Sequence, residues 1–128
     1  MLTVAARARN IAGLVVDGAV RDSAQIRDMG FPTFVRAISI GGASKCAGGS
    51  VGERVNCGSV TVHPGDVVIG DDDGVVVVGL QSVDAVLRAA RRRQQEEAQI
   101  MEAIRHGKST LELLGLKPIV ERLSALSK

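Results

Sequence analysis

The stretch Ile11-Ala12-Gly13-Leu14-Val15-Val16-Asp17-Gly18-Ala19-Val20-Arg21-Asp22 decides the fold of this sequence. Its first half is continuously apolar, which predicts a strand over residues 13–17 buried on both faces between layers of helix. Its second half follows this strand with a guanidinium beside a carboxylate. In α/β proteins, ligands bind beyond the carboxyl ends of strands. Arg21 and Asp22 are therefore the first candidates for a functional site.

The chemistry of these two side chains is complementary. A guanidinium can hold a substrate carboxylate through two parallel hydrogen bonds, and a carboxylate oxygen suits a hard divalent cation such as Mg²⁺. Arg21 is thus a candidate substrate ligand and Asp22 a candidate metal ligand. The structural alternative is that Asp22 caps a helix beginning at Ser23, with Gln25 completing a capping box. The two interpretations are compatible.

Other acidic residues have simpler interpretations. Asp17 precedes Gly18 and is expected to shape the chain there, with support of the Asp22 site as the functional alternative. The run Asp71-Asp72-Asp73-Gly74 invites a metal hypothesis. However, Asp-Gly between two Val-rich segments indicates a hairpin turn, and neighbouring residues of a strand point to opposite faces. We therefore predict a turn at this run.

Helices and strands are expected along the whole chain. The pattern predicts helices over residues 2–9 and 23–29, the second stopped by Gly30 and Pro32, and a strand over residues 33–37. Residues 41–58 are rich in glycine and predict a loop, in which Lys45 is either a solvated cation or a contact for an anionic substrate. The strands expected downstream form a meander over residues 59–62, 67–70 and 75–78.

The last third of the sequence is predicted to be helical. A long helix is expected over residues 82–106, with Gly107 as its C-cap. Ser109-Thr110-Leu111-Glu112 indicates a capping box, and residues 119–126 a final amphipathic helix. On the long helix, Arg92 with Glu96 and Arg93 with Glu97 are four residues apart, which is typical of a solvated, ion-paired face.

Composition limits the class of protein. The 128 residues, 45% of them hydrophobic, predict one compact domain. A net charge of +2 and the absence of Trp and Tyr argue against nucleic-acid binding. Cys46 and Cys57 form no CxxC motif, so unpaired thiols are expected rather than a zinc or redox site. Without a leader or a membrane-length apolar run, the sequence predicts a soluble cytoplasmic protein with no membrane contact.

Several motifs together resemble one known family. The Arg21-Asp22 stretch, Gly30-Phe31-Pro32, the glycine-rich residues 41–58 and the segment from Pro64 to Val78 are similar to the RraA-like family. This family includes pyruvate aldolases that act on 4-hydroxy-4-methyl-2-oxoglutarate and 4-carboxy-4-hydroxy-2-oxoadipate. The resemblance implies an α/β fold, an RraA-like swivelling α/β/α-type domain with a mixed central sheet and a long C-terminal helix. Residues 1–128 would form a single such domain, N-terminally truncated relative to the family.

The resemblance also implies a reaction and roles for individual residues. In such aldolases, cleavage of a 4-hydroxy-2-oxo acid releases pyruvate as its enolate, and oxaloacetate decarboxylation is the expected side activity. Asp22 would hold Mg²⁺ or Mn²⁺, and Arg21 would bind the substrate and stabilise the enolate oxygen. Glu97 would orient metal-bound water from a neighbouring subunit of a homotrimer or homohexamer.

Two alternatives to an active aldolase remain open. Regulators of ribonuclease E of the RraA type carry a similar Asp-Gly-x-x-Arg-Asp stretch and act by protein binding. The third interpretation is an inactive truncated homologue, because the chain begins inside what resembles a central helix of the family. The part without a counterpart normally brings a glycine-containing loop whose backbone N–H groups hold the pyruvate carboxylate. These donors would then be missing or would come from another chain.

Overall fold

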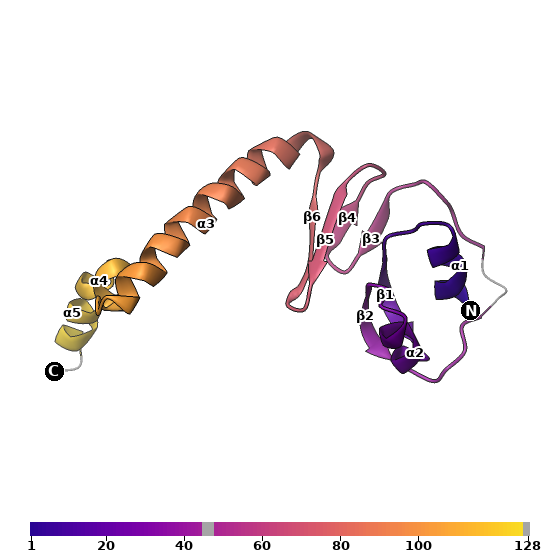
Figure 1. The fold of residues 1–128 in the computed structure, drawn as a ribbon, viewed down its shortest axis with the longest axis horizontal. Coiled ribbons are helices and arrows are strands. Elements are labelled where there is room, and N and C mark those ends of the chain that lie inside the picture. Colours follow the sequence, from indigo (N-terminus) through magenta and orange to yellow (C-terminus); the bar gives the residue numbers. More distant parts are fainter. Residues whose placement is uncertain (45–47, 127–128) are drawn as a thin grey trace. The chain divides into compact units, whose positions relative to one another are not determined.

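The computed structural model of the chain describes residues 1–44 and 48–126, so the predictions for Lys45 and Cys46 lie outside the described residues. The chain divides into two compact units, Met1–Val83 and Asp84–Lys128. Figure 1 shows their helices and strands in sequence colours. In chain order these are α1 (Leu2–Ala8), β1 (Leu14–Val20), α2 (Ser23–Asp28), β2 (Thr33–Ile38), β3 (Val55–Cys57), β4 (Val60–Val62), β5 (Val67–Asp71), β6 (Gly74–Val78), a 3₁₀ turn η1 (Leu80–Ser82), α3 (Val83–Arg105), α4 (Thr110–Leu113) and α5 (Lys117–Leu126).

The first unit contains strands of both directions. β1 and β2 pair in parallel, with a register change between Val16 and Ala19, and lie side by side in Figure 1. β3 with β4 and β5 with β6 are antiparallel hairpins. The expected α/β class and long C-terminal helix are confirmed. Within the described residues, the strands make three two-stranded sheets.

The predicted meander is wrong in one connection. β5 and β6 pair around the Asp71–Gly74 turn as predicted, but β4 pairs with β3. The strand β3 lies inside the stretch that was expected to be a loop. Its turn is formed by Gly58 and Ser59, and Gly58 has φ +63°. Glycine at the first central position is what a type II′ hairpin turn requires, and this turn directs β4 back along β3.

The prediction that the first strand is buried on both faces is also wrong for this chain. Along β1 the residues alternate between half-buried and exposed, and Val15 is 42% exposed. Alternation is typical of a sheet that is covered on one face only. Among the described residues, the buried apolar positions are Ala6 and Phe31. Within this chain, the β1 strand is thus covered on one face only.

A close contact seats the β5–β6 hairpin within the first unit. Gly70 on β5 lies against the ring of Phe34 on β2, where a Cβ atom would overlap the ring. The hairpin turn at its end is confirmed as predicted, because one oxygen of Asp71 accepts from the N–H groups of Asp73 at 3.0 Å and Gly74 at 3.2 Å. Asp71 therefore acts as a turn residue.

The second unit is helical, as expected. α3 ends at Arg105, and Gly107 adopts φ +85° while the Lys108 N–H donates to Ala103 O at 3.1 Å, which is a Schellman-type C-cap. Ser109 caps α4 by accepting from the Glu112 N–H at 3.2 Å. Within the described residues, no helix combines the length and apolar character needed to cross a membrane. That the two units form a single domain stays a prediction.

Candidate functional site

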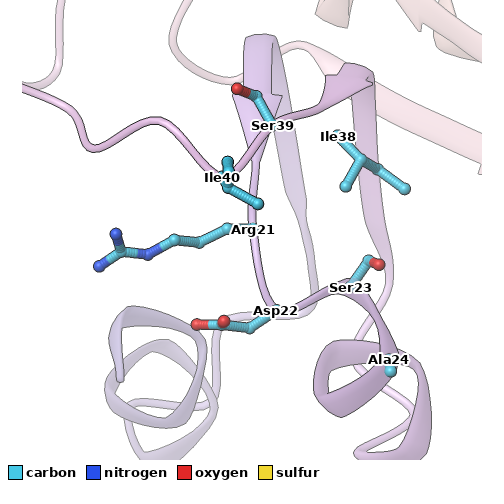
Figure 2. A pocket seen from close by; sticks show the side chains of 7 residues that line it. All are labelled: Arg21, Asp22, Ser23, Ala24, Ile38, Ser39 and Ile40. Carbon is cyan, nitrogen blue, oxygen red and sulfur yellow. The ribbon is translucent and has the colours of Figure 1, made fainter.

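The carboxyl ends of β1 and β2 meet at one edge of their sheet, because the two strands are parallel. The Ser39 N–H donates to Val20 O at 2.9 Å and extends the pairing just beyond both strands. A cleft of about 570 Å³ lies at this edge. Its lining, drawn in Figure 2, consists of Arg21, Asp22, Ser23, Ala24, Ile38, Ser39 and Ile40. The cleft is where the sequence analysis expected a site.

Arg21 is exposed at this cleft. No carboxylate within the described residues forms an ion pair with its guanidinium. A Cβ atom at Gly42 would lie 3.9 Å from Arg21 Nη1, so the glycine backbone passes close to the guanidinium without covering it by a side chain. Its donors are therefore available to a bound anion.

Asp22 occupies the position before α2, but it does not cap that helix. Its backbone is left-handed, with φ 60° and ψ 35°, and its side chain makes no capping hydrogen bond. N-cap residues normally have extended backbone, which brings the side-chain oxygen over the first helical N–H groups. The capping box with Gln25 is thus wrong. In Figure 2 the Asp22 carboxylate extends to the same side as the Arg21 guanidinium.

A left-handed aspartate is tolerated but uncommon, and such residues are concentrated at functional positions. Among the described residues, Asp22 and Asn10 are the non-glycine residues with positive φ. The unusual backbone of Asp22 thus coincides with a carboxylate that has no hydrogen-bond or ion-pair partner in the described part of the chain.

Asp17 has partners on both oxygens. Its Oδ1 pairs with Nε of Arg36 on β2, and its Oδ2 accepts from the Gly58 N–H at 2.8 Å. The carboxylate therefore joins β1, β2 and the β3–β4 turn. It makes no direct contact with Asp22 among the interactions of the described residues.

Glu97 belongs to the second unit, whereas Arg21, Asp22 and Asp17 belong to the first. On α3, Arg93 Nε donates to Glu97 Oε1 at 2.6 Å, and Arg92 lies 3.9 Å from Glu96. The predicted ion-paired face is confirmed. The hydrogen bond to Glu97 raises the pKa of the Arg93 guanidinium above its usual value.

The wall of the cleft at the end of β2 was not predicted from the sequence. Ile38, Ser39 and Ile40 line it together with Arg21. The signal was present, since two parallel strands end at the same edge, and the residue after the second strand is then a lining candidate. Ser39 Oγ accepts from the Gly41 N–H at 3.2 Å, which leaves the hydroxyl hydrogen available to a ligand.

The donor set for a metal is small. Within the described residues, no group of three or more His, Cys, Asp or Glu side chains is arranged to hold an ion. Asp22 offers a single carboxylate at the cleft. Such a set does not form a closed all-protein cage, but it matches the way Mg²⁺ binds, through one or two carboxylates with waters and substrate oxygens completing the shell.

This chain is similar in sequence to two curated proteins. The chain is 37% identical over 92 residues to a putative 4-hydroxy-4-methyl-2-oxoglutarate aldolase of Halalkalibacterium halodurans, covering 72% of this chain and 44% of that protein. It is 32% identical over 112 residues to an uncharacterised protein of Methanocaldococcus jannaschii, covering 88% of this chain and 54% of that protein. The chain thus spans about half the length of these curated relatives.

A solved structure shares the fold. An uncharacterised protein from Pseudomonas syringae pv. tomato superposes with a TM-score of 0.76 at 30% identity, covering 88% of this chain and 56% of that one. Residues 1–77 match the RraA-like family, described as Aldolase/RraA. The matched residues contain β1, Arg21 and Asp22, β2 and both hairpins almost to their end. This chain belongs to the RraA-like family.

Proposed function

We propose that this chain carries the Arg21-Asp22 part of a divalent-metal-dependent pyruvate aldolase site. The reaction is the cleavage of 4-hydroxy-4-methyl-2-oxoglutarate or 4-carboxy-4-hydroxy-2-oxoadipate to pyruvate and a second 2-oxo acid, with decarboxylation of oxaloacetate as a side activity. One observation carries the proposal. A guanidinium and a carboxylate, neither of them paired within the described residues, extend to the same side of one cleft (Figure 2).

The size and charge of the cleft suit a small anionic acid. Its volume of about 570 Å³ falls within the range of small-molecule sites. Arg21 binds the substrate carboxylate through its fork of N–H donors. The same positive charge stabilises the enolate oxygen as the bond between C3 and C4 breaks, which is where the barrier of this reaction lies. The Ser39 hydroxyl lines the same cleft and would donate to a second substrate oxygen.

Asp22 is the residue that would hold Mg²⁺ or Mn²⁺. When bound, the cation supplies Lewis-acid polarisation of the 2-oxo group and so removes the need for a Schiff-base lysine. The left-handed backbone keeps this carboxylate away from the α2 N–H groups, which otherwise compete for its oxygens.

In this proposal, Glu97 of another subunit completes the site. Its carboxylate orients water at the site of a neighbour in a homotrimer or homohexamer, and its pairing with Arg93 fixes its direction on α3. This division can be tested by mixing two inactive variants, Arg21→Ala and Glu97→Ala. Mixed assemblies contain some sites with both native residues, so activity is expected to return on mixing. Persistent inactivity of correctly assembled mixtures would mean that Glu97 does not act at the site of a neighbouring subunit.

The reaction itself is tested by pyruvate release coupled to lactate dehydrogenase, with each 4-hydroxy-2-oxo acid and with oxaloacetate. Release that requires Mg²⁺ or Mn²⁺ and stops with a chelator is the expected result. Arg54→Ala is the matched control, because Arg54 is an exposed arginine of the same unit outside the cleft. If the folded wild-type chain releases no pyruvate with either metal, the proposal is wrong for this chain, and a protein-binding role is favoured.

A further inference from the structure

The pairing of β1 with β2 contains one extra residue on β1. On the two sides of the irregularity, the pairs are Val16 with Val35 and Ala19 with Ala37. Asp17 and Gly18 together therefore stand opposite Arg36. An extra residue of this kind is a β-bulge, which bends a strand and redirects the side chains that follow it.

The bulge decides which residue of β2 lies beside Arg21. Beyond it, Val20 pairs with Ile38 and the Ser39 N–H donates to Val20 O. Without the extra residue, the register of the first half would place Val20 beside Ser39. The bulge thus sets which residue of β2 stands beside the end of β1, where Arg21 follows.

Asp17 is the residue that holds this bulge on both sides. Its Oδ1 pairs with Arg36, the residue that the bulge faces, and its Oδ2 accepts from the Gly58 N–H at 2.8 Å. Gly58 begins the β3–β4 turn with φ +63°. One carboxylate therefore connects the irregular point of β1 to the neighbouring strand and to a hairpin 41 residues away in sequence.

We propose that Asp17 is a positioning residue for the Arg21-Asp22 site. Its carboxylate holds the Asp17-Gly18 bulge against Arg36 and Gly58, and so fixes the direction in which Arg21 and Asp22 enter the cleft. The effect on turnover rests on the proposed function, whereas the effect on the geometry of Arg21 does not.

The Asp17–Arg36 ion pair is exposed to solvent, so its effect on the site can be distinguished from its effect on stability. The Arg36 side chain is 66% exposed and the Asp17 side chain 32% exposed. Ion pairs this exposed contribute little to the free energy of unfolding. Loss of the ion pair with Arg36 is therefore expected to lower the melting temperature only slightly. The affinity of the site for Mn²⁺ is expected to fall clearly.

The test compares Asp17→Ala with Asp66→Ala in the full chain. Asp66 is a matched control, since its carboxylate also accepts from a backbone N–H, that of His63 at 2.8 Å, but in a turn outside the cleft. Two readouts are used: the affinity for Mn²⁺ alone by calorimetry, and the NMR resonances of the Arg21 Nε–Hε group and the Asp22 amide. Asp17→Ala is expected to weaken Mn²⁺ binding about 10-fold or more and to shift both resonances. Asp66→Ala is expected to change neither.

A third variant guards against loss of the fold. Asp17→Asn keeps an acceptor oxygen for the Gly58 N–H and loses only the charge facing Arg36, so it is expected to restore part of the Mn²⁺ affinity and the resonance positions. If Asp17→Ala shifts the Arg21 and Asp22 resonances no more than Asp66→Ala does, the positioning role is wrong. If wild-type protein binds no Mn²⁺ and releases no pyruvate, the proposed function fails, and the resonance comparison still decides the role of Asp17.

Discussion

Two acidic regions of the first unit look similar in sequence and differ in structure. The turn Asp71–Gly74 holds three consecutive aspartates, whereas the end of β1 offers Asp22 beside Arg21. In the turn, Asp71 already accepts from two backbone N–H groups. The Asp22 carboxylate accepts from none of the described residues, because its left-handed backbone directs it away from the first N–H groups of α2. The number of carboxylates is therefore a poorer guide to a metal site than the hydrogen bonds that each carboxylate already makes.

The largest effect on activity is expected from removing the Arg21 guanidinium, which lies at the end of β1 and has no counterpart in the Asp71–Gly74 turn. Arg21→Ala should lower metal-dependent pyruvate release about 100-fold or more, as loss of one donor to a developing oxyanion does. The fold should persist, since Arg21 has no ion-pair partner among the described residues. Steady-state kinetics and circular dichroism check the two parts. Turnover that survives in Arg21→Ala would remove this residue from the mechanism.

The two acidic regions should differ in how a substitution changes the affinity for Mn²⁺. Asp22→Asn is expected to weaken Mn²⁺ binding about 10-fold or more, which corresponds to about 1.4 kcal/mol. Asp72→Asn, which changes one carboxylate of the acidic turn, should leave the isotherm unchanged. Calorimetry at one ionic strength measures both. An unchanged isotherm for Asp22→Asn, or a loss confined to Asp72→Asn, would reverse the comparison.

For the free energy of unfolding, a substitution in the acidic turn should matter more than it does for metal binding. Asp71→Ala removes the acceptor of two backbone hydrogen bonds and should lower the free energy of unfolding by about 1 kcal/mol. Asp72→Ala is the control and should change it by less than about 0.5 kcal/mol. Urea denaturation followed by circular dichroism suits a chain without Trp or Tyr. Equal losses in the two variants would mean that the Asp71 bonds do not stabilise the turn.

The smallest effect is expected from relieving the backbone of Asp22. Asp22→Gly should raise the free energy of unfolding by about 0.5 kcal/mol, because glycine adopts φ near +60° without the steric cost of a Cβ atom. The same variant should bind Mn²⁺ as weakly as Asp22→Asn. A loss of stability in Asp22→Gly would show that the carboxylate supports α2 after all.

Much of the secondary structure could be predicted because it depends on local patterns. Gly107 and Ser109 mark helix ends through φ and a hydroxyl acceptor, and both act as predicted. β3 was missed since Val55-Asn56-Cys57 is short, stands in glycine-rich sequence and forms only through its pairing with β4. Helix ends are a local property here, whereas the formation of a short strand depends on its pairing.

The candidate site was predictable in its residues and not in its geometry. The order of Arg21 and Asp22 after an apolar run identifies the edge of the sheet. The backbone of Asp22 could not be foreseen, because an aspartate before a helix has the same sequence pattern whether it caps the helix or not. The partners of Asp17 were also hidden, since Gly58 lies 41 residues away and comes close only after the β3–β4 turn forms.

The stretch that begins at Ser39 and ends at Gly58 is fastened at both ends, by the Ser39 N–H at Val20 O and by the Gly58 N–H at Asp17. The entropic cost of closing such a segment grows only with the logarithm of its length, so that doubling it costs about 0.6 kcal/mol. Its first residues already line the cleft. A change in the length of the chain between these two hydrogen bonds is therefore expected to cost little stability, while the Arg21-Asp22 pair stays in place.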